Sequence, residues 1–334
     1  MSGVFIISFD CEGKWGVADH LDARIEELFT TANLLQNYRD LLALLGEHGL
    51  RATFAFVGAY TLSAEAFLDR RVEYEPLLSS SWCRVFAAAL QRGQLEGWFN
   101  PEAARLVSRA GGHEIAGHGF SHRPLTPADA TRDDVRWELD ALRRLELFHD
   151  QSWTLVYPRN QIGYVDELGD HGIVGYRERR QHAFGRAGAL LSELNVVAAA
   201  EPHASDAAAI RIPAGFFLNW RSGGRRMVPA AVTVRRWTSL LRDAAKHDRV
   251  VHLWSHPHNF LTGDGMLPMF REIVRVAAAM CTRGDLVNMT QIGYAKRVKS
   301  LDAVAVTPPQ NVGVLAIDKH EHVDDSHGPA GQQS

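Results

Sequence analysis

The stretch Val4-Phe5-Ile6-Ile7-Ser8-Phe9-Asp10-Cys11-Glu12-Gly13 decides the fold that the sequence predicts. Its apolar run is closed by Asp10 and is too short for a secretory signal, so we interpret it as a first β-strand. Alternate residues of a strand share a face, which places Asp10 and Glu12 together and turns Cys11 away. Two carboxylates this close repel each other unless a cation or a proton intervenes. The strand end is therefore a candidate site, with an ordinary solvated strand end as the alternative.

Further short apolar runs alternate with helical stretches along the rest of the chain. Strands are expected at 52–57, 113–117, 154–157, 173–176, 209–212, 250–254 and 286–288, and helices at 38–48, 131–149, 233–247 and 266–283. About eight such alternations favour a parallel α/β sheet covered on both faces. No G-x-G-x-x-G motif follows the first strand, which argues against a dinucleotide-binding fold. We therefore expect a (β/α) barrel with about seven to eight parallel strands and long loop insertions.

Composition limits the possible partners and locations. The chain has 334 residues, of which 46% are hydrophobic and 22% charged, as in ordinary globular proteins. We expect the barrel to span residues 1–300, with insertions at 60–100 and 177–232, and a polar, partly disordered tail at 301–334. A formal net charge of −3 gives no electrostatic reason to expect a nucleic-acid partner. Without a signal peptide or a transmembrane segment, a cytoplasmic location is predicted, and the oligomeric state stays open.

Histidines follow two of the predicted strands, at the edge where barrel enzymes gather their active sites. In Gly117-His118-Gly119-Phe120-Ser121-His122, glycines permit a turn that brings two imidazoles to one ion. In His252-Leu253-Trp254-Ser255-His256-Pro257-His258-Asn259, His256 precedes a proline, where a strand ends and a side chain faces a cleft. The chain contains 16 histidines, so we expect at least one of these to be an ordinary core or loop residue.

Taken in order, these segments resemble the polysaccharide deacetylase family, also known as carbohydrate esterase family 4 or the nodulation-type chitooligosaccharide deacetylase homology domain. Residues Ser8–Glu12 resemble its T-F-D-D motif, and His118–His122 its H-S/T-x-x-H motif. Residues 51–58, Arg-Ala-Thr-Phe-Ala-Phe-Val-Gly, resemble its second strand. The resemblance covers roughly residues 4–300. It implies a divergent member with a distorted barrel and metal-dependent hydrolysis of an acetyl group on a sugar.

The resemblance also implies a role for each matching residue. Asp10 would be the general base, and Glu12 would join His118 and His122 as a ligand of a divalent metal, expected to be Zn²⁺. His256 would be the general acid, with His258 as the second choice, and Arg159 would orient Asp10. The expected substrate-binding residues are Tyr157, Asn160, Trp254 and His258. An ordinary surface cation is the alternative for Arg159.

The motifs depart from the family pattern at three points. Cys11 stands where the family has its second aspartate, so Glu12 is the nearest replacement. Gly119 and Phe120 replace the usual Ser or Thr after the first histidine, and Pro158 precedes Arg159 where arginine usually comes first. These changes keep a metal site but weaken the implied specificity for acetyl sugars.

The expected substrate is an acylated amino sugar of a surface-glycan precursor, for example in lipopolysaccharide O-antigen biosynthesis, carried on a nucleotide or a polyprenyl lipid. The loop at 221–226 would then meet a diphosphate, with a solvated loop as the alternative. Two other functions stay open. One is hydrolysis of non-sugar amides such as cyclic ureides, and the other is a catalytically silent glycan-binding or assembly protein.

Overall fold

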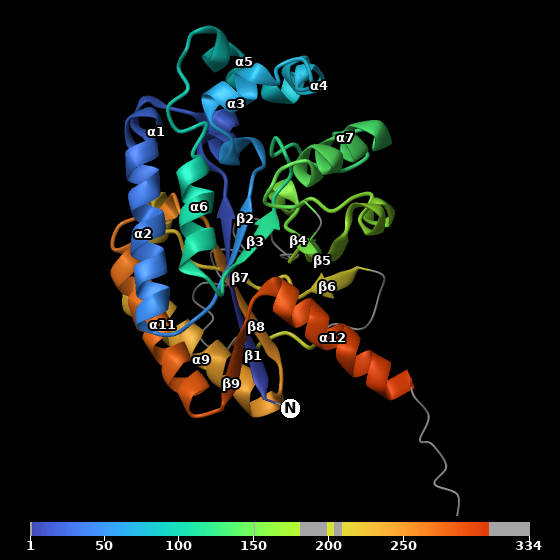
Figure 1. Ribbon diagram of the computed structural model, residues 1–334. Coiled ribbons are helices and arrows are strands. Elements are labelled where there is room, and N and C mark those ends of the chain that lie inside the picture. Colours follow the sequence, from blue (N-terminus) through green and yellow to red (C-terminus); the bar gives the residue numbers. More distant parts are fainter. Residues whose placement is uncertain (1, 150, 181–198, 204–208, 307–334) are drawn as a thin grey trace, which may run out of the picture.

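The computed structural model describes residues 2–149, 151–180, 199–203 and 209–306. Within these ranges the strands form one curled sheet in the order β6-β5-β4-β3-β2-β1-β8-β7, and β9 also pairs with β1 (Figure 1). Every strand pair in this sheet is parallel. The predicted distorted (β/α) barrel is therefore confirmed.

The predicted strands all exist, with ends shifted by a few residues. The observed strands are β1 (Gly3–Cys11), β2 (Thr53–Phe56), β3 (Glu114–Gly117), β4 (Trp153–Leu155), β5 (Ile173–Arg177), β6 (Ile210–Ile212), β7 (Phe216–Phe217), β8 (Val250–Ser255) and β9 (Leu286–Met289). The sequence missed β7 because two residues are too few to show a period.

Strand β1 lies in the middle of the sheet and is buried along its whole length. It pairs with β2 through Ser8–Cys11 and with β8 through Val4–Phe9. Because both of its faces are covered, its sequence is a nearly continuous apolar run that changes to carboxylates only at its end. The parallel registers bring the C-terminal ends of β1, β3 and β8 to one edge of the sheet.

Helices cover the sheet, and several of them begin at a residue whose side chain caps the helix. They are α1 (Ala23–Leu28), α2 (Thr31–Glu47), α3 (Ala64–Asp69), α4 (Glu75–Leu78), α5 (Arg84–Gln91), α6 (Pro101–Ala110), α7 (Arg132–Arg143), α9 (Ala230–His247), α10 (Asn259–Thr262), α11 (Met266–Thr282) and α12 (Gln291–Val306). Asn100 caps α6 through its side chain, and Thr131 forms a capping box with Asp134 at the start of α7. None of the helices in the described ranges has the length and hydropathy needed to cross a membrane.

Residues 60–100, which interrupt the predicted barrel rhythm, are a packed helical extension. Helices α3, α4 and α5 lie together beyond the C-terminal ends of the central strands (Figure 1). Their aromatic rings, Phe67, Tyr74, Phe86, Trp98 and Phe99, contact one another and belong to the main hydrophobic core. The extension therefore adds a rigid wall next to the edge that carries the site. Parts of the predicted 177–232 insertion (181–198 and 204–208) and the tail from 307 onward lie outside the described residues.

Candidate metal and catalytic site

The predicted site segments meet at the floor of a cavity of about 390 Å³, at the C-terminal ends of β1, β3 and β8. Its lining includes Asp10, Glu12, His118, His122, Arg159, Asn160, Trp254, His256 and His258. Tyr157, predicted to bind substrate, is not among the lining residues in the described part of the chain. Its ring is instead buried in the core, where it packs edge-on against Tyr176.

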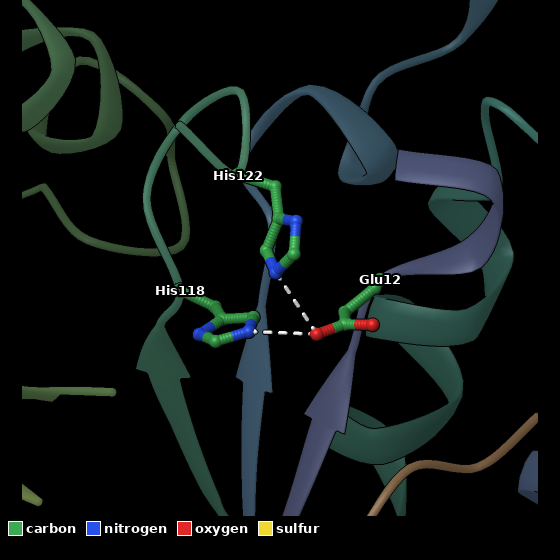
Figure 2. A group of neighbouring side chains, drawn as sticks. All are labelled: Glu12, His118 and His122. Carbon is green, nitrogen blue, oxygen red and sulfur yellow. Dashed lines mark hydrogen bonds and ion pairs between the residues drawn. The ribbon is translucent and has the colours of Figure 1, made fainter. Parts of the chain in front are cut away.

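Glu12, His118 and His122 form a buried cluster that we name the ligand corner (Figure 2). The Nε2 atoms of His118 and His122 lie 2.9 and 3.0 Å from the same carboxylate oxygen, Oε1 of Glu12. One ligand atom from each residue lies within 4.8 Å of the other two. Three side chains from two distant segments thus point at one small volume.

The backbone fixes which nitrogen of His118 faces this volume. The carbonyl oxygen of Val156 accepts a hydrogen bond from Nδ1 of His118 at 2.7 Å, which leaves Nε2 toward Glu12. Burial lowers the pKa of His118, but its hydrogen bond to Glu12 and the nearby carboxylates outweigh burial, so the net shift is upward. Burial also lowers the pKa of His122, and there it outweighs the opposing effect of Glu12, so the net shift is downward. The surroundings thus shift the pKa values of the two imidazoles in opposite directions.

The loop that carries both histidines is held by Glu138 on α7. The Glu138 carboxylate accepts hydrogen bonds from the backbone N–H groups of Phe120 and Ser121 at 2.6 and 3.0 Å, and from the Ser121 hydroxyl. The turn also needs a positive φ at Gly119 (70°) and at His122 (61°). A non-glycine residue at positive φ is strained and persists only where its surroundings enforce it. Glu138, a residue that sequence reasoning missed, supplies part of that enforcement.

Glu12 is enclosed just as closely, by the turn that follows it. A Cβ atom added to Gly16 would lie 1.7 Å from the Glu12 carboxylate, so only glycine leaves room for this side chain. The neighbouring Trp15 donates a hydrogen bond from Nε1 to the Trp98 carbonyl at 2.8 Å. Its ring also packs on the ring of Phe86, with centroids 4.4 Å apart. The 60–100 extension thereby fixes the turn that encloses Glu12.

The chemistry of the ligand corner fits a divalent metal ion. Nδ1 of His122 is buried with no hydrogen-bond partner in the described ranges, and Nε2 approaches Glu12 without forming a hydrogen bond. Buried polar atoms without partners are rare in native proteins and require an explanation. One carboxylate oxygen and two imidazole nitrogens are the donor set of many catalytic zinc sites. Glu12, His118 and His122 could together hold such an ion.

Asp10, two residues before Glu12, has a different partner, the guanidinium of Arg177. Nη1 and Nη2 of Arg177 donate to Oδ1 and Oδ2 of Asp10, both at 2.7 Å, and both side chains are buried. Burial raises the pKa of Asp10, but the charge of Arg177 and the neighbouring imidazoles outweigh it, so the pKa lies below its ordinary value. With Glu12 and His256, Asp10 forms a second group with metal-ligand spacing. Both of its oxygens, however, are already bonded to Arg177.

The sequence predicted that Arg159 orients Asp10, but in the structure Arg177 makes that contact. Arg159 instead donates to the Asp19 carboxylate at 2.8 and 3.1 Å and stacks over the ring of Trp82. The reason lies in the backbone, since Arg159 has a φ of 58°, which turns its side chain toward the rim. Arg177 was missed, although it follows a predicted strand just as Arg159 does.

His256 faces both carboxylates from the end of β8. Its Nε2 lies 3.6 Å from Oε1 of Glu12 and 3.9 Å from Oδ2 of Asp10, while the Asn259 amide contacts its Nδ1 at 3.2 Å. His258 stacks against His256, with ring centroids 4.9 Å apart. Burial and the charge of His256 lower the pKa of His258 to about 3. His258 is therefore neutral at physiological pH, which makes it unsuited to the role of a general acid.

Aromatic side chains form one wall of the cavity above these polar groups. Trp254, predicted to bind substrate, lines the cavity together with Phe217 and Trp220, which were missed. Apolar rings beside a few convergent polar groups are typical of small-molecule sites, and this volume lies in the range of about 300–1,000 Å³ found for such sites. In the loop at 221–226, Arg221 donates to the backbone carbonyls of Asp264 and Val228. That arginine therefore has a structural role.

Comparisons with known proteins agree with this fold. The family model described as polysaccharide deacetylase matches residues 30–163, which include both histidines of the ligand corner but neither carboxylate of β1. A crystal structure provisionally assigned as a polysaccharide deacetylase from Mycobacterium smegmatis is similar, with a TM-score of 0.57, 17% identity and 96% of each chain covered.

More distant structures are similar in fold alone. A family 4 carbohydrate esterase from Streptomyces lividans, in complex with acetate, has a TM-score of 0.41 and 10% identity, covering 86% of this chain and 91% of its own. A CE4 family pseudoenzyme from Bacillus anthracis has a TM-score of 0.44 and 12% identity, covering 88% of this chain and 66% of its own. No curated protein matches the sequence.

Proposed function

We propose that the chain, which the polysaccharide deacetylase family model matches over residues 30–163, is a divergent member of that family and a metal-dependent hydrolase that removes an acyl group, expected to be acetyl, from an amino sugar. The observation that carries this proposal is the convergence of Glu12, His118 and His122 beside Asp10, at the floor of an aromatic-walled cavity. A divalent metal, with Zn²⁺ as the proposed ion, would polarise the acyl carbonyl and acidify a water at this place.

Asp10 is the proposed general base. Its oxygens are held by Arg177, which keeps the carboxylate ionised and aimed at the edge of the ligand corner. An ionised, fixed carboxylate takes the proton of a water as that water attacks the acyl carbon. Because Asp10 is buried and already oriented, little reorganisation is needed when the reaction begins.

His256 is the proposed general acid. The amine that leaves in amide hydrolysis must gain a proton, and His256 presents Nε2 within 4 Å of both Asp10 and Glu12. The Asn259 contact at Nδ1 keeps the ring in that orientation. His258 stays neutral behind it and is assigned to packing and substrate contact. The proposed base and acid thus lie side by side at the C-terminal ends of two paired strands, β1 and β8.

The cavity favours a small substrate with an apolar ring face. Trp254, Phe217 and Trp220 form a wall on which a sugar ring can stack, and Asn160 lies at the floor with its amide oxygen bonded to Arg177. We propose an acylated amino sugar of a surface-glycan precursor as the substrate, a choice that assumes the cytoplasmic location expected from the sequence. The proposed barrel domain spans residues 1–300 with the tail at 301–334.

The test is a hydrolysis screen with the purified full chain, before and after metal chelation. Free N-acetylglucosamine, its nucleoside-diphosphate form and a chitooligosaccharide are incubated with enzyme, and released acetate is measured, with hydantoin as the cyclic-ureide control. Acetate release that chelation abolishes and Zn²⁺ restores supports the proposal. Hydrolysis of hydantoin alone would favour the non-sugar alternative. Binding of an acyl sugar without any turnover would favour a silent glycan-binding protein.

A further inference from the structure

A continuous chain of buried hydrogen bonds runs away from Asp10 into the barrel. Nη1 of Arg177, which already donates to Asp10, also donates to Oγ of Ser8 at 3.2 Å. The Ser8 hydroxyl lies 2.8 Å from Nε2 of His252, and Nδ1 of His252 lies 2.8 Å from the Pro213 carbonyl oxygen. Ser8 and His252 are both fully buried, on the paired strands β1 and β8.

Each proton in this chain has only one consistent place. The Pro213 carbonyl can only accept, so Nδ1 of His252 carries a hydrogen, and in the neutral ring Nε2 then presents a lone pair. The Ser8 hydroxyl therefore donates to His252, which leaves its oxygen to accept from Arg177. Burial lowers the pKa of His252 to about 3, in keeping with a neutral ring. The hydrogen bonds of this series thus each have a defined donor and acceptor, and the series ends on the Arg177 guanidinium that holds Asp10.

The donors of Arg177 show why this support matters. Nη1 donates to Asp10 and Ser8, and Nη2 donates to Asp10 and Asn160. The guanidinium also lies 4.5 Å from the ring centroid of Trp254, one of the cavity walls. Without the Ser8 oxygen, one buried proton of Nη1 loses its acceptor. The guanidinium is then held less firmly, and any shift of it moves the Asp10 carboxylate that is bonded to it.

We propose that Ser8 and His252 are positioning residues that lock Arg177, and through it the Asp10 carboxylate, in the orientation needed for proton abstraction. This inference rests on the proposed role of Asp10 as the base. Neither residue touches the ligand corner or lines the cavity in the described part of the chain. Loss of either should therefore leave metal and substrate binding intact while it slows the chemical step.

Three variants of the full chain test the proposal. Ser8→Ala removes the hydroxyl with little change in volume. His252→Asn keeps a donor near Pro213 but lacks an acceptor for Ser8, whereas His252→Gln restores an acceptor at the Nε2 position. We expect Ser8→Ala and His252→Asn to keep the zinc content and KM of the wild type while kcat falls about 10- to 100-fold, as a misplaced catalytic group predicts. His252→Gln should recover most of that loss.

A matched control separates positioning from general stability. Thr154 on β4 is also a buried hydroxyl, and it donates to the Glu114 carboxylate at the start of β3, far along the strand from His118. Thr154→Val therefore removes a comparable hydrogen bond and should leave kcat unchanged. Wild-type kcat in Ser8→Ala, or an equal loss of kcat in Thr154→Val, overturns the proposal.

Crystal structures of the variants keep this test independent of the proposed function. In Ser8→Ala we expect the Arg177 guanidinium to rotate, so that its two-point contact with Asp10 is lost, while the ligand corner keeps its geometry. An unchanged two-point contact overturns the positioning role whether or not a substrate is known. If the wild type hydrolyses no acyl sugar, the proposed function fails, and the crystal structures alone decide the positioning role.

Discussion

Two carboxylates at the end of one strand have opposite surroundings in this molecule. Glu12 faces two imidazoles in the ligand corner, whereas Asp10 faces Arg177, supported by Ser8 and His252; we name this second group the base corner. Both carboxyl groups are buried, and both have a pKa below the ordinary value. Asp10 reaches that state through a permanent cation. Glu12 reaches it through imidazoles, which can release a proton to solvent and bind a metal ion in its place. Burial alone therefore does not decide what a carboxylate does.

Removal of the ligand corner should have the largest effect. Glu12→Ala deletes the only carboxylate of the proposed metal set, and we expect zinc content, measured by elemental analysis, to fall to background and turnover to vanish. His118→Ala and His122→Ala should behave alike. Full metal occupancy in all three variants would defeat the assignment of the ligand corner.

Asp10→Asn is the matched change in the base corner, two residues away. An amide of the same shape cannot act as a base, so we expect kcat to fall by about 10²–10⁴-fold while the protein keeps its metal. Asp10→Asn should thus lose turnover but keep its metal, whereas Glu12→Ala should lose both. Metal loss in Asp10→Asn would show that the two corners are not separate, and unchanged turnover would remove Asp10 from the role of base.

Arg177 and Arg159 should differ in how much each contributes to the stability of the fold. Loss of one partner of a buried ion pair typically costs about 3–5 kcal/mol, so Arg177→Ala should lower the free energy of unfolding strongly in a denaturant titration. The pair of Arg159 with Asp19 is partly exposed, and such pairs contribute about 0–1 kcal/mol. Arg159→Ala should therefore change stability little. Equal losses in the two variants would contradict the distinction drawn between the pairs.

The sequence predicted the ligand corner but not the support of the base corner, for a physical reason. In a parallel sheet the ends of all strands meet at one edge, so residues such as His118 and Glu12 can be placed together from strand positions alone. Which of two arginines reaches Asp10 depends instead on backbone angles, such as the φ of 58° at Arg159, that no periodicity reveals. His252 was noticed as part of a histidine-rich segment, yet its role depends on contact with Ser8, far away in the chain.

A smaller effect is expected from Gly16, where the atoms nearest to an added Cβ all belong to Glu12. A methyl group at this position would collide with the Glu12 carboxylate and displace it from the imidazoles. Displacement of a supporting contact typically weakens metal binding by about 10–100-fold. Gly16→Ala should therefore raise the zinc dissociation constant, measured by competition with a chromophoric chelator. Gly46→Ala is the control, since a Cβ there meets no atom of the described residues within 4 Å.

The smallest expected effect is a pH dependence contributed by the base corner. His252 is buried and has a folded-state pKa of about 3, compared with 6.5 for a free imidazole. Between these values the unfolded chain binds a proton that the folded chain excludes, so this residue destabilises the fold as pH falls from 6.5 toward 3. One such group contributes at most about 1.4 kcal/mol per pH unit. Denaturant titrations of the metal-free protein at several pH values should show a slope that His252→Gln reduces by up to that amount. An identical slope in the variant would mean that His252 is not held neutral, and the direction assigned to the hydrogen-bond chain through Ser8 would then be wrong.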